Sequence, residues 1–361
     1  MDCTQFGRRV CEHKFVRWDN LRIERQDGES AHLPGFRDPA TLRRFDAPEA
    51  MGIRFYEVEA RSVINEVPEK SRMPFRYTIN PYRGCTHSCV YCFARPTHTY
   101  LDMNAREDFE REIVVKVNVP ELVRKELAKA SWKGDHVALG TNTDPYQWVE
   151  GRYKLTRGIW EAMRDYANPC SILTKSPLLL RDLDLMKEIR ERAHFSAALS
   201  IPTLEEKAWR QTEPHTPHPR KRMEAVAELN RAGIPTSVLI GPMIPGVNDS
   251  PEQIKELLEL AGEAGATNVT GIPLHLRGEV KEIWFDWLRE HRPDLIPHYE
   301  ELYGRRAYMK RDQSERMRQM VRYPRRRDRR HARPFRGTQV PPPETGGGNS
   351  AEEPAAQPSL F

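Results

Sequence analysis

Six short apolar, β-prone runs separated by helical patterns constrain the fold more than any other feature of this chain. The runs are Phe75–Ile79, His136–Leu139, Cys170–Leu173, Phe195–Ile201, Thr236–Ile240 and Asn268–Ile272. Most are continuous rather than alternating, as expected for parallel strands covered on both faces. Strands that alternate with helices predict βα units around a parallel sheet. Six units are too few for a complete (βα)8 barrel, so we expect an α/β fold with a partial (βα)6 TIM-like barrel.

Three intervening segments carry helix signals. Ser250-Pro-Glu-Gln253 is typical of a capping box with proline at the first helical position, and an apolar stripe follows from Ile254. A second helix is predicted after Asp182, and Gly233 is expected to end a helix just before a strand.

Composition predicts four regions. Residues 1–74 form an N-terminal lead-in of mixed polarity, and residues 75–280 form the barrel core. Residues 281–336 are predicted to form a helical appendage and an arginine-rich arm, and residues 337–361 a disordered tail rich in Pro, Gly, Ser, Glu and Ala. The arm, Arg322–Arg336, either attracts phosphate or is a solvated extension, and both interpretations stay open.

Membrane and secreted classes are not expected. No run of about 18 apolar residues is present, so we predict no membrane-spanning helix. Six cysteines without a signal peptide or an even framework favour a reducing, cytoplasmic location. The net charge of +5 says little by itself.

Three cysteines, Cys85, Cys89 and Cys92, follow the first predicted strand in a C-x3-C-x2-C pattern. Active sites of TIM-like barrels lie in such loops. Three close thiolates suit an iron–sulfur cluster, in which three protein ligands leave one iron of a [4Fe–4S] cube open. The alternative is a zinc site that adds His87 or His98 to the same cysteines.

The triad and its surroundings resemble the radical S-adenosylmethionine (SAM) superfamily. The resemblance rests on three segments, Asn80–His98, Gly140–Gln147 and Ser171–Lys175, which look like an actinobacterial-type group related to spore photoproduct lyase. It covers roughly residues 16 to 335. Residues 1–15 are therefore expected to come from an upstream start codon.

The resemblance implies cofactors and site residues. Cys85, Cys89 and Cys92 would hold a [4Fe–4S] cluster, whose electron cleaves SAM to methionine and a 5′-deoxyadenosyl radical. Tyr91 would flank the adenine. The remaining candidate cofactor-binding residues are Gly140, Thr141, Asn142, Asp144 and Ser200. Asn142 and Asp144 also fit ordinary turn chemistry, and that alternative stays open.

The chain departs from the lyase at one position. The lyase uses a cysteine hydrogen-atom donor at the end of the second core strand, where this chain has Leu139–Asn142 and no thiol. Cys170 is expected at the amino end of the next strand, remote from the catalytic rim. Tyr146 is a candidate radical relay or a hydrogen-bonding residue. Lys175 is a candidate partner of the SAM carboxylate or of a substrate phosphate, or a surface lysine.

These features favour an enzyme that abstracts hydrogen from DNA, with an external electron donor. The alternatives are a radical enzyme acting on RNA or protein, and a non-catalytic zinc-stabilised nucleic-acid-binding module. The terminal peptide, with Gln357, Leu360 and Phe361, resembles the segments by which bacterial DNA enzymes dock on the sliding clamp, which makes the clamp a candidate partner.

Overall fold

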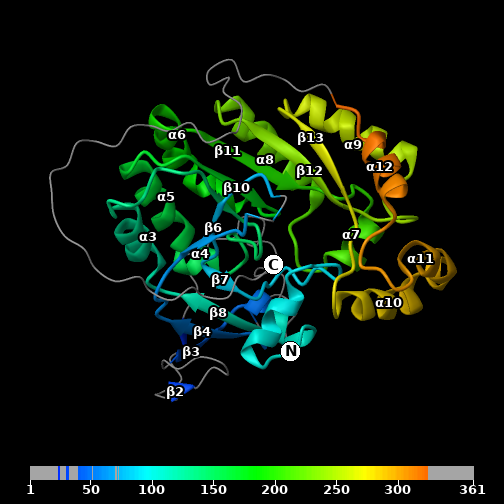
Figure 1. The fold of residues 1–361 in the computed structure, drawn as a ribbon, viewed down its shortest axis with the longest axis horizontal. Coiled ribbons are helices and arrows are strands. Elements are labelled where there is room, and N and C mark those ends of the chain that lie inside the picture. Colours follow the sequence, from blue (N-terminus) through cyan, green and yellow to red (C-terminus); the bar gives the residue numbers. More distant parts are fainter. Residues whose placement is uncertain are drawn as a thin grey trace, which may run out of the picture.

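The larger of two sheets is a curved, seven-stranded sheet that forms the barrel core (Figure 1). The computed structural model describes residues 23–24, 30–31, 40–50, 52–69, 71 and 73–323. The strand order is β13-β12-β11-β10-β9-β6-β5. The strands are β5 (Ile64–Glu66), β6 (Tyr77–Ile79), β9 (Val137–Leu139), β10 (Cys170–Thr174), β11 (Phe195–Ser200), β12 (Thr236–Met243) and β13 (Val269–Pro273). All pairs are parallel except β5 with β6, so the six predicted strands and the partial barrel are confirmed.

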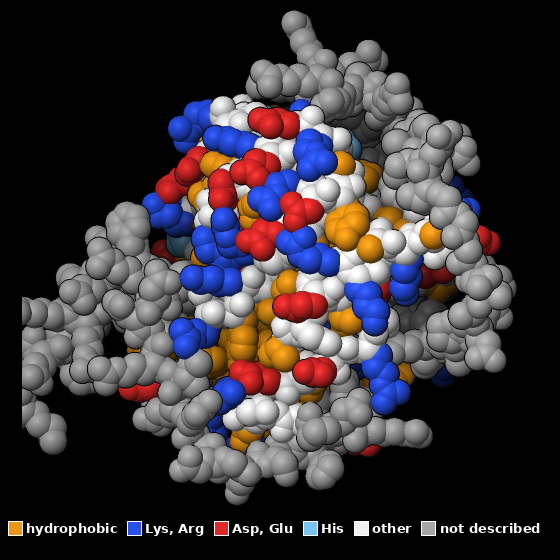
Figure 2. All heavy atoms as spheres, turned by 90° about the vertical axis from the view of Figure 1, so that its left-hand side faces the viewer, with side chains coloured by type: hydrophobic (Ala, Val, Ile, Leu, Met, Phe, Trp, Pro, Cys, Tyr) orange, Lys and Arg blue, Asp and Glu red, His pale blue; other side chains and the backbone are white. Residues whose placement is uncertain are grey.

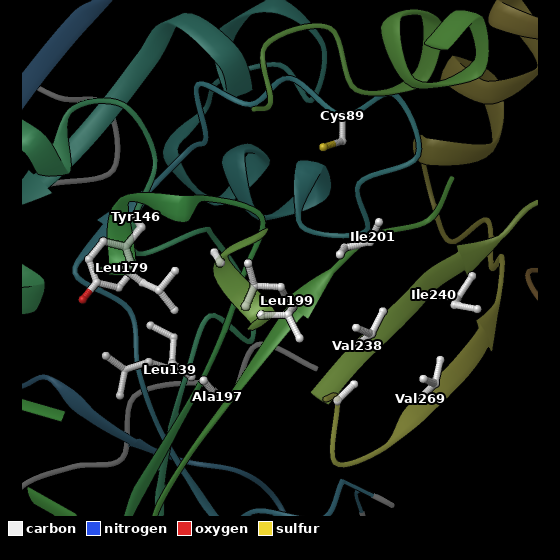
Figure 3. Packing of buried hydrophobic residues seen from close by; sticks show 14 of the residues in the cluster. Cys89, Leu139, Tyr146, Leu179, Ala197, Leu199, Ile201, Val238, Ile240 and Val269 are labelled. Carbon is white, nitrogen blue, oxygen red and sulfur yellow. The ribbon is translucent and has the colours of Figure 1, made fainter. Parts of the chain in front are cut away.

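Helices cover the outer face of this sheet. They are α3 (Val119–Leu127), α5 (Leu155–Asp165), α6 (Leu183–Arg192), α8 (Pro219–Arg231) and α9 (Pro251–Glu263). The predicted helix signals are confirmed: Ser250 accepts a hydrogen bond from the Gln253 backbone N–H, and Gly233 has a positive φ just after α8. Figure 3 shows aliphatic side chains of three strands, Leu139 of β9, Ala197 of β11 and Val238 of β12, packed in the buried core.

Opposite charges alternate on the surface formed by α3, α5 and α6 (Figure 2). Arg124 of α3 pairs with Asp165 at 2.5 Å, and Arg164 of α5 pairs with Glu188 of α6 at 3.0 Å. Each such exposed pair contributes about 0–1 kcal/mol. We interpret this face as a solvated surface rather than a site for an anionic partner.

A second sheet lies against one end of the barrel (Figure 1). Its order is β1-β3-β4-β8-β7, with β2 also paired to β3. The strands are β1 (Ile23–Glu24), β2 (Ser30–Ala31), β3 (Ala40–Phe45), β4 (Arg54–Val58), β7 (Tyr82–Arg83) and β8 (Glu112–Lys116). The predicted N-terminal lead-in therefore contributes strands to both sheets. β7 follows β6 after only two residues, so the chain passes directly from the barrel into the second sheet.

The described C-terminal part is helical, with α10 (Val280–His291), α11 (Ile296–Tyr303) and α12 (Arg311–Met320). Trp284 and Trp287 stack at 4.5 Å between ring centroids, and the Trp287 indole N–H donates to the Gln211 carbonyl at 2.9 Å. This packing anchors the helices to the barrel. Within the described ranges, no helix is long and apolar enough to cross a membrane. Most of the arginine-rich arm, the predicted tail and the first 22 residues lie outside the described residues.

Candidate functional site

The three cysteines lie in a loop of residues 84–92, which we call the cysteine loop. It follows β7 and reaches the carboxyl ends of the parallel strands. In Figure 3, Cys89 lies on the side of the sheet at which Ile201 follows β11. Gly84 opens the loop with φ +78°, and a Cβ atom there would approach the Phe109 carbonyl oxygen to 2.9 Å. Only glycine fits this turn without moving the backbone.

The thiols occupy an apolar, shielded environment. Cys85 and Cys89 are buried, Cys92 is partly buried, and none forms a disulfide within the part of the chain that the structure describes. Burial, and then the neighbouring Cys85, raise the pKa of Cys92 to about 11. Burial also raises the pKa of Cys89, as does the Glu213 carboxylate. A bound cationic centre would reverse this preference, because a coordinating thiol is deprotonated.

The candidate metal donors are the three thiols of the loop and the two histidines of the zinc alternative. In the described part of the chain, no three Cys, His, Asp or Glu side chains converge as ligands of one metal ion would. Of the two histidines in the zinc alternative, His98 places Nε2 2.8 Å from the Glu112 carbonyl oxygen, and His87 places Nδ1 3.4 Å from Asp144 Oδ2. The three thiols lie close enough for the charge of one to raise the pKa of another, and three thiolates that near one another suit a [4Fe–4S] cluster.

Two buried side chains hold the cysteine loop in shape. Gln147 accepts from the Thr86 backbone N–H at 2.9 Å and donates to the Gly84 carbonyl at 3.1 Å. Arg95 donates to the Cys89 carbonyl at 2.9 Å and to the Ser88 carbonyl at 3.1 Å. These bonds satisfy loop backbone groups that water cannot reach.

Asp144 connects three elements of the site. Its carboxylate accepts from the Thr174 hydroxyl at 2.6 Å, the Lys175 backbone N–H at 2.7 Å and the Tyr146 backbone N–H at 2.9 Å. His87 of the cysteine loop lies on the same carboxylate, and this proximity lowers the Asp144 pKa despite its burial. Asp144 thus ties the ends of β9 and β10 to the cysteine loop.

A buried charge network lies beside the loop. The Glu213 carboxylate, after α7 (Glu206–Thr212), pairs with Lys175 at 2.8 Å and with Arg222 at 2.6 Å. Tyr91 donates its hydroxyl to the same carboxylate. Burial alone would raise the Glu213 pKa, but Arg222 and Lys175 outweigh it and lower that pKa to about 2. Lys175 also donates to the Ser200 hydroxyl at 2.6 Å.

The structure brings most of the predicted site residues together at the carboxyl ends of the parallel strands. Tyr146 instead has its hydroxyl group in the buried core. The Tyr146 hydroxyl donates to Asp182 at 2.8 Å and accepts from the Trp160 indole at 2.8 Å. Its side chain is fully buried, which matches the hydrogen-bonding alternative. Gly140 packs against the Leu173 carbonyl, so its absent side chain permits strand packing. Cys170 begins β10 in the core, as expected.

Within the described residues, several polar side-chain atoms near the strand ends are buried without a hydrogen-bond partner, among them Asn80 Oδ1, Thr86 Oγ1 and Thr141 Oγ1. Asn80 and Thr141 follow β6 and β9, which pair with each other, and Thr86 lies in the cysteine loop. Buried polar groups are normally bonded. Their lack of partners at one edge indicates a site for a polar ligand.

Sequence reasoning missed Glu213, Arg222, Gln147 and Arg95 as site-shaping residues. Glu213 follows a helix, in a Thr-Glu-Pro context typical of an exposed turn, and Arg222 lies within a charged helix. Their burial depends on long-range packing. Gln147 and Arg95 lie within two of the segments on which the family resemblance rests, and those segments were the only signal for them.

Comparisons with known proteins agree with this geometry. The family model described as the radical SAM superfamily matches residues 79–261. An uncharacterized protein of Mycobacterium tuberculosis is 44% identical over 289 residues, which cover 80% of this chain and 85% of that protein. A radical SAM Nα-GlyT isomerase of Pseudomonas phage M6 is 25% identical over 239 residues, covering 65% of this chain and 47% of that protein. A solved spore photoproduct lyase in complex with dinucleoside spore photoproduct has a similar fold, with a TM-score of 0.54, 17% identity, and coverage of 74% of this chain and 77% of that one.

Proposed function

Because the chain belongs to the radical SAM superfamily, with SAM and a [4Fe–4S] cluster as its cofactors, we propose that Cys85, Cys89 and Cys92 bind that cluster. The observation that carries the proposal is the position of three shielded, unpaired thiols beyond the carboxyl ends of the parallel strands. When bound, the cluster supplies the electron that cleaves SAM to methionine and a 5′-deoxyadenosyl radical.

SAM is proposed to lie along the ends of β6, β9 and β10. Thr141 Oγ1 is buried without a partner and suits a hydrogen bond to the amino acid end of SAM, and Asn142 lies next to it. Lys175 is partly exposed and suits the SAM carboxylate. Gly140 and Asp144 position these groups, Ser200 orients Lys175, and Tyr91 flanks the adenine of SAM. Tyr146 supports the packing beneath them.

We propose DNA as the substrate. Two features support it: the fold resembles a lyase solved with a dinucleoside lesion, and the sequence carries eight arginines between Arg322 and Arg336. The missing thiol after β9 requires a different final hydrogen donor from that of the lyase. The reaction also needs an external electron donor, which suits a cytoplasmic location. By analogy with spore photoproduct lyase, the specific activity that we propose is that of a DNA repair lyase.

Anaerobic reconstitution tests the cofactor assignment. The wild-type protein is expected to bind about four irons per chain and, with dithionite, to release 5′-deoxyadenosine from SAM. The triple Cys85→Ala, Cys89→Ala, Cys92→Ala variant is expected to lose both. Cys170→Ala is the matched control, since Cys170 is buried in the core away from the loop. Equal product from the triple variant would reject the assignment.

The substrate is tested with deuterated nucleic acids and peptides. Transfer of deuterium from DNA into 5′-deoxyadenosine supports the proposal, whereas transfer only from RNA or a peptide replaces DNA by that class. Clamp docking through Gln357, Leu360 and Phe361 lies outside the described residues and stays a prediction. Removal of the last five residues should abolish recovery on immobilised clamp, and unchanged recovery would end that idea.

A further inference from the structure

Two basic side chains next to the cysteine loop have no acidic partner among the described residues. Arg83 of β7 lies opposite Val114 of β8, and Lys116 follows Val114 by two residues. Because side chains alternate along a strand, Arg83 and Lys116 lie on the same face of the second sheet. Burial, and then the positive charge of Arg83, lower the Lys116 pKa to about 7. The two cations therefore repel each other in a shielded position.

Arg83 is the exception among the buried arginines of the site. Arg222 faces the Glu213 carboxylate, and Arg95 faces Glu110 and four backbone carbonyls. Arg83 is partly buried, yet within the described residues it has no hydrogen-bond or ion-pair partner. A guanidinium cannot shed its proton, so partial burial leaves its charge less well solvated and favours an anion beside it. This arrangement indicates that an anion belongs beside it.

The pair lies at the edge where the substrate would approach. Arg83 precedes Cys85 by two residues, and the Lys116 ammonium donates to the Asn80 carbonyl at 3.0 Å, at the end of β6. Figure 1 shows β7 and β8 between the barrel and the outer strands of the second sheet. The pair is separate from the Lys175–Glu213–Arg222 network, in which Lys175 is the residue proposed for the SAM carboxylate.

We propose that Arg83 and Lys116 bind a phosphodiester group of the DNA substrate and so position the strand beside the cluster. The inference rests on the proposed function. An arginine fork and a lysine point charge without a competing carboxylate match the oxygen atoms of a phosphodiester. One bound phosphate would relieve the repulsion between the two cations and supply the partner that Arg83 lacks. The alternative anion at this edge is the SAM carboxylate.

The test uses anaerobic, cluster-loaded protein and a fluorescein-labelled single-stranded thymidine oligonucleotide, with anisotropy measured over a salt titration. Arg83→Gln and Lys116→Gln are each expected to weaken binding roughly three- to tenfold and to reduce the slope of log K against log salt by about 0.7. Arg83→Lys should retain the slope. Lys133→Gln and Arg231→Gln, exposed residues near the amino ends of the strands, should leave both values unchanged.

A second measurement separates the two anions and checks folding. The Kd of SAM, from equilibrium dialysis, is expected to be unchanged in Arg83→Gln, and iron content and the circular dichroism melt should match the wild type. Weakened SAM binding with an unchanged DNA slope would overturn the inference in favour of the SAM carboxylate. An unchanged slope in Arg83→Gln and Lys116→Gln alike would overturn it too. A wild-type protein that forms 5′-deoxyadenosine but binds no DNA would also reject the DNA substrate.

Discussion

Replacing Glu213 by glutamine tests whether the buried charge network stabilises the site as the geometry implies. The carboxylate is 1% exposed and is shared by Arg222, which is fully buried, and by Lys175, which is 15% exposed. Glutamine keeps the size of the side chain and removes the charge, so two shielded cations lose their counter-ion. Breaking a buried ion pair from one side costs about 3–5 kcal/mol. At roughly 2–4 °C per kcal/mol for a domain of this size class, the melting temperature should fall by roughly 6–20 °C.

Urea unfolding of the wild type, Glu213→Gln and Glu206→Gln measures this effect. Glu206 lies on the preceding helix and pairs with Arg210 in an exposed position, so its replacement should cost less than about 1 kcal/mol. Adding Arg222→Met to Glu213→Gln should recover part of the lost stability, because one uncompensated charge disappears. If Glu213→Gln lowers the free energy of unfolding no more than Glu206→Gln does, the charge of Glu213 does not stabilise the network. The interpretation that this carboxylate holds Tyr91 and Lys175 in place would then be wrong.

Three further predictions concern the fold and the loop. Gly140→Ala would place a Cβ atom 1.8 Å from the Leu173 carbonyl oxygen and should prevent stable folding, whereas Gly134→Ala, with open space around it, should cost about 1–2 kcal/mol in a thermal melt. Gln147→Ala removes both bonds to the cysteine loop and should lower iron retention during dialysis, with a loss of about 1–3 kcal/mol in stability. Burial lowers the His136 pKa from 6.5 to about 3, so the unfolded chain binds a proton that the folded chain does not. Stability should therefore fall as the pH drops from 6.5 towards 3, by about 2 kcal/mol at pH 5, and His136→Gln should flatten that dependence in urea titrations.

The barrel could be predicted from the sequence because most of its buried strands are continuous apolar runs, which are visible in the local composition. The run at Cys170 begins where β10 begins, and the runs at Phe195 and Thr236 begin with β11 and β12. The proline and serine at the start of α9 carry a local signal that does not depend on distant contacts. Continuous apolar runs and helix caps are short-range features, so one sequence suffices to find them.

The second sheet and the charge network could not be predicted in this way. β7 has only two residues, and β4 pairs with β8 across more than fifty residues of chain. Such pairings are set by tertiary contacts rather than by local pattern. The thiols were found because their spacing is itself the signal. Glu213 was not found, because a glutamate that will be buried looks the same in sequence as one that faces water.

The short link between β6 and β7 has a consequence for any attempt to shorten this protein. The superfamily match begins at residue 79. However, β8 pairs with β4 and β9 pairs with β6, and the partner strands β4 and β6 lie upstream of that residue or end at it. A fragment that starts at the motif boundary would leave two open backbone edges flanking the cysteines, and open edges invite pairing with other chains. The smallest piece able to keep its iron should therefore begin no later than residue 54, where β4 starts, well upstream of the recognisable motif.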